Sequence, residues 1–292
     1  MTNYYKYLPT SPEDEKWGLY VLNAGFNSIN SHDVYPAPSH PAHHYFSWEN
    51  GRVLNEFQII YISKGKGVFE SENYPSAIIN EGSILLLFPG QWHRFKPNQE
   101  TGWDEHWVGC NGSFIQNLAL NGFIAPQNQV QYIGLHENIV SLFERIIRIT
   151  KAEKTGYQPL VSGVVSHLLG QIHAINKESV FEKEGPTESI INKARTILRA
   201  NINQDLSMEK LADELNVGYA WFRKAFKTYT GIAPNQYLLQ LKIENAKSLL
   251  SDKKRSVKEI AFELNFESVF YFSKLFKEKT GLSPEHYRKS LQ

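Results

Sequence analysis

The residues with the clearest chemical potential are basic side chains that recur at matching places in two segments. Lys224 and Lys227 return fifty positions later as Lys274 and Lys277, and Arg223 stands at the start of the first set. A guanidinium fork donates two hydrogen bonds to the O6 and N7 edge of guanine, and an ammonium suits that edge or a phosphate. These residues therefore indicate recognition of a nucleic acid, without covalent catalysis.

The segments that carry these residues are two copies of one pattern. FKTYTGIAPNQY at 226–237 matches FKEKTGLSPEHY at 276–287 with an offset of 50, and LADELN at 211–216 matches IAFELN at 260–265 with an offset of 49. The second copy therefore has one extra residue between Asn265 and Phe276, which we place in a loop between helices. Each copy is predicted to be a helix, a short turn and a second helix.

Cap residues support this division. Ser207 and Ser256 suit helix N-caps, the latter in a capping box with Glu259. The helices then end at glycines in the left-handed conformation, and prolines open the next helices. These residues are Gly231, Gly281, Pro234 and Pro284.

A helix-turn-helix places its second helix in the major groove of DNA. We expect such recognition helices at 219–227 and 269–277, and a connecting helix at 237–250 that spaces them for two successive grooves. A helical repeat with no role on DNA is the alternative.

IAFELNFESVFYFSKLFKEKTGLSPEHYR resembles the second helix-turn-helix of the AraC/XylS family of bacterial transcription regulators, and the resemblance extends over 189–288. It implies that the faces opposite the phenylalanines of each recognition helix read bases. In the first helix these residues are Tyr219, Ala220, Arg223 and Lys224, and in the second they are Val269, Phe270, Ser273 and Lys274. Lys227 and Lys277 are expected at phosphates. The apolar pair Val269-Phe270 departs from the family pattern and implies a less hydrogen-bonded second site.

The front half reads as short strands over 17–110, typical of a sandwich or barrel, with a hairpin turn expected at 64–67. Two amphipathic helices follow 134, and their apolar stripes cover the sheet or form a dimer seam. The front half loosely resembles the cupin-like sensing domain of the same family. The expected fold is α+β: a cupin-like β-barrel or sandwich with two helices at 1–175, a linker at 176–187, and an all-α DNA-binding domain at 188–292 with two helix-turn-helix motifs joined by a long helix.

The front domain carries aromatic and charged residues suited to a small-molecule site. The resemblance maps sugar contacts onto Arg52, His93, Phe95, Glu105 and Trp107 and implies that an arm at residues 1–16 folds over the ligand. Further candidates are Trp48, Trp92 and Trp103. For the tryptophans and His93 the alternative is a packed core residue, whereas buried charges such as Arg52 and Glu105 need partners.

Several functions are disfavoured. The His-x-His set of metal-binding cupins is missing, and His40, His43 and His44 are predicted in a surface loop, so we expect no metal, no cofactor and no enzyme activity. The single cysteine, Cys110, excludes an internal disulfide. The start lacks a signal-peptide pattern and no run could span a membrane, so a cytoplasmic location without a membrane partner is expected.

The front part of the chain is acidic and the back part is basic, which indicates a different function for each. Residues 186–292 carry 18 Lys and Arg against 12 Asp and Glu, while residues 1–185 carry 13 against 18. Together with this charge division, the family resemblance implies a sugar-responsive activator of carbohydrate-utilisation genes, with double-stranded DNA and a mono- or oligosaccharide as partners, RNA polymerase as a further candidate, and a homodimer as the assembly. The alternatives are a non-sugar effector, a constitutive DNA-binding protein whose barrel is a dimer scaffold, and a cupin enzyme fused to a DNA reader.

Overall fold

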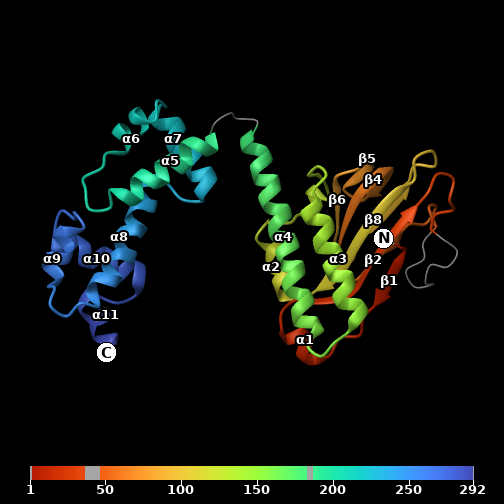
Figure 1. Ribbon diagram of the computed structural model, residues 1–292, viewed down its shortest axis with the longest axis horizontal. Helices are drawn as coiled ribbons and strands as arrows, with labels where there is room; N and C mark the ends of the chain where they lie inside the picture. The colour runs from red at the N-terminus through yellow and green to blue at the C-terminus, as the bar shows by residue number, and fades with distance from the viewer. Residues whose placement is uncertain (1, 37–46, 183–186, 292) are drawn as a thin grey trace. The chain divides into compact units, whose positions relative to one another are not determined.

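The computed structural model describes residues 2–36, 47–182 and 187–291, and the chain forms two compact units, Met1–Ser179 and Val180–Gln292 (Figure 1). The predicted His40, His43 and His44 lie outside the described residues. The elements of the first unit, in chain order, are β1 Tyr4–Tyr7, α1 Pro12–Lys16, β2 Tyr20–Ile29, β3 Arg52–Val53, β4 Phe57–Ser71, β5 Tyr74–Asn80, β6 Ser83–Leu87, β7 Trp92–Pro97, β8 Trp103–Asn111, α2 Ser113–Leu120, a 3₁₀ turn Pro126–Asn128, β9 Val130–Tyr132, α3 Glu137–Ala152 and α4 Tyr157–Glu182.

The described strands of the first unit pair antiparallel, with β1-β2-β8-β4-β6-β9 as the main order. The long strand β4 continues beyond this path to pair with β5 and β7, and β3 pairs with β7. Alternate side chains therefore serve two cores. One core lies between the sheet and the helices and includes Ile59, Tyr61 and Val108, and the other includes Ile60, Ile62 and Trp103 on the inner face.

The predicted hairpin turn at 64–67 is wrong, because β4 runs through it without a turn. Gly65 has φ +84, and a Cβ there would lie 2.1 Å from the Gly102 carbonyl oxygen. Gly67 lies against the Trp103 ring, 2.4 Å from the position of its missing Cβ. These glycines therefore let the strand bend and approach its neighbour closely, as at a bulge. The hairpin turn comes later, between Ser71 and Tyr74.

Helices α3 and α4 pack on the sheet with the stripes that the sequence predicts (Figure 1). The start of α4 is also fixed by hydrogen bonds to β2, because Gln158 accepts from the Val21 N–H at 3.0 Å and donates to its carbonyl at 2.9 Å. Residues 176–182 of the expected linker continue α4. NKESVFE contains no helix breaker, since the first, Gly185-Pro186, comes later.

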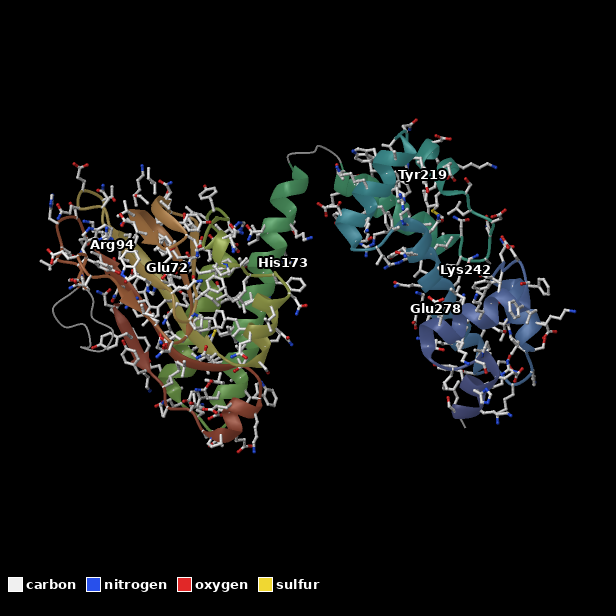
Figure 2. The ribbon with its side chains drawn as sticks, turned by 180° about the vertical axis from the view of Figure 1, so that it is seen from behind. Glu72, Arg94, His173, Tyr219, Lys242 and Glu278 are labelled. Carbon is white, nitrogen blue, oxygen red and sulfur yellow. The ribbon has the colours of Figure 1, made fainter. Side chains whose placement is uncertain are left out.

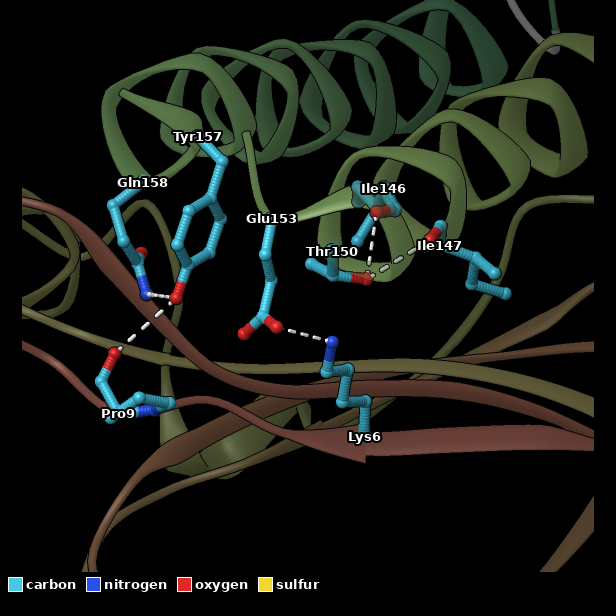
Figure 3. A network of polar contacts seen from close by, with 8 residues as sticks. All are labelled: Lys6, Pro9, Ile146, Ile147, Thr150, Glu153, Tyr157 and Gln158. Atoms are coloured by element: carbon cyan, nitrogen blue, oxygen red, sulfur yellow. Dashed lines mark hydrogen bonds and ion pairs between the residues drawn. The ribbon is translucent and has the colours of Figure 1, made fainter. Parts of the chain in front are cut away.

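The N-terminal arm is docked on the body of the first unit. Residues 4–7 form β1 at the edge of the sheet, paired with β2. Figure 3 shows Lys6 donating to the Glu153 carboxylate at 2.6 Å, and the Tyr157 hydroxyl donating to the Pro9 carbonyl at 3.4 Å. The arm is thus held at the junction of α3 and α4 as well as along β2.

The second unit is helical. Its helices are α5 Thr187–Ala200, α6 Met208–Glu214, α7 Tyr219–Thr230, α8 Pro234–Leu250, α9 Val257–Glu263, α10 Val269–Thr280 and α11 Pro284–Ser290. We call α6–α7 the first motif and α9–α10 the second motif. Each has its own core, with Phe222 and Phe226 in one and Phe272 and Phe276 in the other.

The predicted caps are confirmed. Ser207 and Ser256 accept hydrogen bonds at the starts of α6 and α9, and the capping box with Glu259 is present. Gly231 and Gly281 end α7 and α10 at φ +84 and +81. The turn spans residues 215–218 in the first motif and 264–268 in the second, so the extra residue lies in the predicted loop.

Candidate DNA-reading and ligand-binding sites

The first recognition helix, α7, buries one face and exposes a basic one. Phe222, Ala225 and Phe226 face its core. Because residues three and four apart share a face, Ala220, Arg223, Lys224 and Lys227 lie exposed on the outside. Tyr219 is partly buried and packs against the core, so it is less accessible than the other predicted base-reading residues of this helix. The long basic side chains of this helix are exposed to solvent.

The second recognition helix, α10, has the same arrangement with an apolar tip. Ser268 caps it by accepting from the Tyr271 N–H at 3.1 Å. Phe270 is 80% exposed, which suits contact with a thymine methyl. Lys274 and Lys277 are exposed, whereas Ser273 and Val269 are only partly so.

Two exposed aromatic residues on the recognition helices were missed by the sequence analysis. Trp221 in α7 and Tyr271 in α10 occupy equivalent positions and are 38% and 46% exposed. Their repeat at an offset of 50, next to Ala220 and Phe270, was the available signal. A ring at this position adds stacking surface beside the basic side chains.

A second candidate site lies on the inner face of the β-domain. Five predicted ligand residues gather on this side: Arg52, His93, Phe95, Glu105 and Trp103. Arg52 donates through Nε to Nε2 of His93 at 3.2 Å, and its guanidinium lies 5.4 Å from the centroid of the Phe95 ring. Trp107 shares the face of β8 with Glu105 and packs against the same core.

Glu105 is tied into this face by two hydrogen bonds. Asn27 donates to one carboxylate oxygen at 3.3 Å, and the Tyr35 hydroxyl donates to the other at 3.2 Å. We call Arg52, His93, Glu105, Asn27 and Tyr35 the interior polar set. Buried polar groups are costly unless they are paired, so a set of this kind inside a β-domain is a feature of a binding site.

Burial controls the charge states of the interior polar set. It raises the pKa of Glu105 from 4.5 to about 7, although hydrogen bonds from Asn27 and Tyr35 and the charge of Arg52 oppose the rise. Burial and, to a smaller extent, the charge of Arg52 lower the pKa of His93 from 6.5 to about 3. His93 is therefore neutral at pH 7, which fits Nδ1–H donating to the Gln91 carbonyl while Nε2 accepts from Arg52.

The raised pKa of Glu105 predicts a pH-dependent stability. A carboxyl whose pKa is higher in the folded protein stabilises the fold at low pH and loses that contribution as the pH rises toward the folded pKa. In the wild-type protein, Glu105 should therefore lower the free energy of unfolding by about 2 kcal/mol as the pH rises from 5 to 7, and this decrease should be absent in Glu105→Gln. Urea unfolding followed by tryptophan fluorescence checks this, since five of the six tryptophans are in the first unit.

His93 acts in the opposite direction at acid pH, but it is present in both proteins and cancels in their difference. A difference between the two unfolding free energies that stayed constant from pH 5 to pH 7 would contradict the assignment of Glu105.

Trp48 and Trp92 lie apart from the interior polar set, on the outer face of β7. The Arg94 guanidinium lies 4.3 Å from the centroid of Trp48 and 5.5 Å from that of Trp92, and Lys96 lies 4.1 Å from Trp48. Arg94, labelled in Figure 2, is also paired with Glu70. Residues 92, 94 and 96 alternate with His93 and Phe95, so their side chains point away from them.

This outer cluster holds the short segment that leads into Arg52. Trp92 donates through Nε1 to the Asn50 carbonyl at 2.8 Å, and Arg94 donates to the Trp48 carbonyl at 2.7 Å. Gly51, at φ +62, leaves room for the Trp92 indole, which lies 2.5 Å from where a Cβ would be. The Trp92 indole and the Trp48 carbonyl thus fix the segment before Arg52 from the outer face of β7.

The amides and hydroxyls on the inner face were not among the predicted ligand-binding residues. Asn27 is the cross-strand neighbour of Glu105, and Gly25 is that of Trp107. At the other end of β2, Asn23 donates to Glu56 at 2.8 Å and accepts from Gln58 at 3.0 Å. Alternate polar residues in VLNAGFNS were the available signal, but pairing with β8 is a tertiary property.

Among the described residues, no three His, Cys, Asp or Glu side chains are placed to hold a metal ion together. Within the same residues, no helix has the length and apolar character needed to cross a membrane.

The fold and the two sites define a two-part DNA-binding regulator: a β-domain with a polar interior and a helical unit with two helix-turn-helix motifs. Residues 32–169 match the AraC-like ligand binding domain, and residues 211–290 match a helix-turn-helix domain. The chain belongs to the AraC family of transcription regulators, as its sequence resemblance predicts, and it is not an enzyme.

Similarity to named transcription regulators covers most of the chain. The chain is similar to the raffinose operon transcriptional regulatory protein RafR of Pediococcus pentosaceus, with 25% identity over 84% of this chain and 89% of that protein. It is 27% identical to the HTH-type transcriptional activator RhaR of Escherichia coli K12 over 79% of this chain and 84% of that protein. Among solved structures, the C-terminal domain of AraT, a response regulator from Geobacillus stearothermophilus, is 31% identical over 35% of this chain and 84% of that chain, with a TM-score of 0.34.

Proposed function

We propose that this regulator responds to a mono- or oligosaccharide bound on the inner face of its β-domain and activates carbohydrate-utilisation genes. The observation that carries the proposal is the interior polar set, in which a guanidinium, a buried carboxyl, an amide and a hydroxyl lie beside aromatic rings. Sugars present hydroxyls that donate and accept, and an apolar C–H face that stacks on aromatic rings. The name of the raffinose operon regulator supports the same class of effector.

The interior polar set favours a neutral, hydroxyl-rich ligand over a charged one. Arg52 and the ionised form of Glu105 carry opposite charges in the same region of the inner face, and each influences the pKa of the other. A ligand with net charge would leave one of them uncompensated, whereas a sugar hydroxyl can donate to Glu105 and accept from Arg52 without changing the total charge. The amides of Asn27, Asn23 and Gln58 add further sites of the same kind.

On DNA, we propose that α7 and α10 enter successive major grooves. Arg223 reads guanine, Lys224 and Lys274 contact bases, and Phe270 meets a thymine methyl, with Ala220 and Ser273 close to the bases. Lys227 and Lys277 contact phosphates and add affinity without sequence information. Tyr219 and Val269 shape the starts of the two helices, since both pack against their cores.

Regulation requires that the sugar favour one arrangement of the protein over another. We propose a homodimer whose DNA engagement changes when the sugar binds, with RNA polymerase as the next partner and the cytoplasm as the location. The exposed outer faces of α3 and α4 are the candidate dimer seam. The name of the relative RhaR, a transcriptional activator, supports activation as the direction.

Thermal unfolding of the full-length protein against a panel of pentoses, hexoses and oligosaccharides tests the effector. A sugar present at 100 times its Kd should add about 2.7 kcal/mol to the stability of the first unit. Arg52→Met, which keeps the apolar stem, should lose this response, whereas Lys66→Met at an exposed position of β4 should keep it. If no sugar shifts the transition of the folded protein, a non-sugar effector or the constitutive scaffold replaces this proposal.

A further inference from the structure

Lys242 is a buried lysine at the junction of the two helix-turn-helix motifs. It lies in the middle of α8, the helix that connects the motifs, and only 8% of it is exposed (Figure 2). Lysine is almost never this buried without a partner, because its ammonium loses hydration. Burial accordingly lowers its pKa. Placing a lysine here costs stability, so its contacts indicate what it does.

The ammonium of Lys242 holds the turn of the second motif. It donates to the Asn265 carbonyl at 3.1 Å and lies 5.4 Å from the centroid of the Phe266 ring. Asn265 is the left-handed residue of that turn, with φ +51, and Phe266 is buried in the core of the second motif. Lys242 therefore contacts two residues of the turn that joins α9 to α10.

The same ammonium is close to the first motif. The carboxylate of Asp205, in the loop between α5 and α6, raises the pKa of Lys242 against the effect of burial. A groove of about 290 Å³ lies here, lined by Asp205 and Leu206 before the first motif, Lys242 on α8, and Asn265 and Phe266 in the second motif. Lys242 thus lies in one groove with Asp205, in the loop that precedes the first motif, and with the turn of the second motif.

The first motif has no equivalent of this lysine. In its core α5 contributes Ile191, Ala194 and Leu198, which correspond to Ile243, Ala246 and Leu250 of α8 at a constant offset of 52. The counterpart of Lys242 is therefore Ile190, which packs against the first core. An apolar residue is sufficient to build one motif, so the lysine of the second serves something other than its core.

We propose that Lys242 is a positioning residue that fixes the second recognition helix relative to the first, and so sets the spacing of the two DNA contacts. It acts through the Asn265 turn on one side and Asp205 on the other, without touching DNA. The role belongs to the DNA-binding unit and is independent of the effector.

The test measures the distance between the recognition helices in the full-length protein without DNA. Spin labels are attached to Thr228→Cys and Glu278→Cys, which replace exposed residues near the ends of α7 and α10, and the distance distribution is recorded by pulsed electron paramagnetic resonance. The native thiol, Cys110, is buried with its pKa raised to about 12 and stays unlabelled. Lys242→Met keeps the stem but removes the charge and donors, and should at least double the width of the distribution.

Two comparisons separate positioning from simple loss of a lysine. Lys242→Arg, which keeps donors and charge, should restore the narrow distribution, and Lys247→Met, on the same helix but paired with Glu244, should leave it unchanged. An unchanged width in Lys242→Met would overturn the proposal. If Lys242→Met unfolds at a much lower temperature than the wild type, Asp205→Lys replaces it in the test, because it reverses the charge of an exposed residue. A distribution of wild-type width in Asp205→Lys would show that Lys242 only supports folding.

The consequence on DNA provides a second readout. A duplex is first selected from a random pool with the wild-type protein, and versions with one or two base pairs inserted between its half-sites are prepared. Wild-type binding should fall steeply with insertion, and Lys242→Met should flatten this dependence at least threefold. An equally steep dependence in both proteins would also count against the positioning role. Failure of the wild-type protein to select any duplex would instead contradict DNA reading itself.

Discussion

Replacing Arg223 with alanine is expected to weaken binding to the selected duplex by about 1–3 kcal/mol, or roughly 5- to 150-fold. Arg223 is exposed on the outer face of α7, opposite Phe222 and Phe226. Its guanidinium is free to donate two parallel hydrogen bonds to one guanine, which no shorter side chain can replace. The loss should be concentrated at one base pair, so changing that pair in the duplex should cost the variant little more.

Lys227→Ala is the matched comparison, one turn further along the same helix. A phosphate contact should be lost there, so affinity should fall by a similar factor for every duplex and the salt dependence should decrease by about one charge. Binding measured by fluorescence anisotropy across several salt concentrations separates the two patterns. Equal losses on all duplexes in Arg223→Ala would show that it contacts the backbone only.

Replacing Gly65 with alanine is expected to destabilise the first unit by about 2–5 kcal/mol. Two costs combine here, because the left-handed φ of +84 disfavours any Cβ and the new methyl would overlap the Gly102 carbonyl oxygen at 2.1 Å. The carbonyl belongs to the backbone and cannot rotate away. Urea unfolding monitored by tryptophan fluorescence gives the change in the free energy of unfolding.

Gly90→Ala isolates the backbone contribution. Gly90 has a similar φ, +75, but a Cβ there meets nothing within 4 Å. Gly90→Ala should therefore lower the free energy of unfolding of the first unit by only about 1–2 kcal/mol. Equal effects of the two substitutions would mean that the strand absorbs the overlap, and the close approach of β4 to residue 102 would then have no energetic weight.

The helical unit could be predicted closely from the sequence because its signals are local. Serine caps, terminal glycines and first-turn prolines act within four residues, and the repeat locates each of them twice. The recognition helices accordingly begin at Tyr219 and Val269, as predicted. The predicted helix at 237–250 also appears, extended by one turn to Pro234.

The β-domain was less predictable because its signals depend on partners far along the chain. Gly65 and Gly67 look like a turn in isolation, but they adapt β4 to residues near 102. Trp92 lies on the face of β7 opposite His93, and Arg52 is placed beside His93 only because β3 pairs with β7. Lys242 likewise looks like an ordinary helix-surface charge until the turn at Asn265 is folded against it.

The presence of a separate core in each motif has a consequence for how this regulator changes over generations. Substitutions around Phe222 and Phe226 affect one core, and those around Phe272 and Phe276 affect the other, so their effects are expected to add. One motif can therefore change its base preference while the other motif still binds its own half of the target sequence. Selection can retune a promoter in two small steps, each tolerated by itself, instead of requiring both halves to change at once.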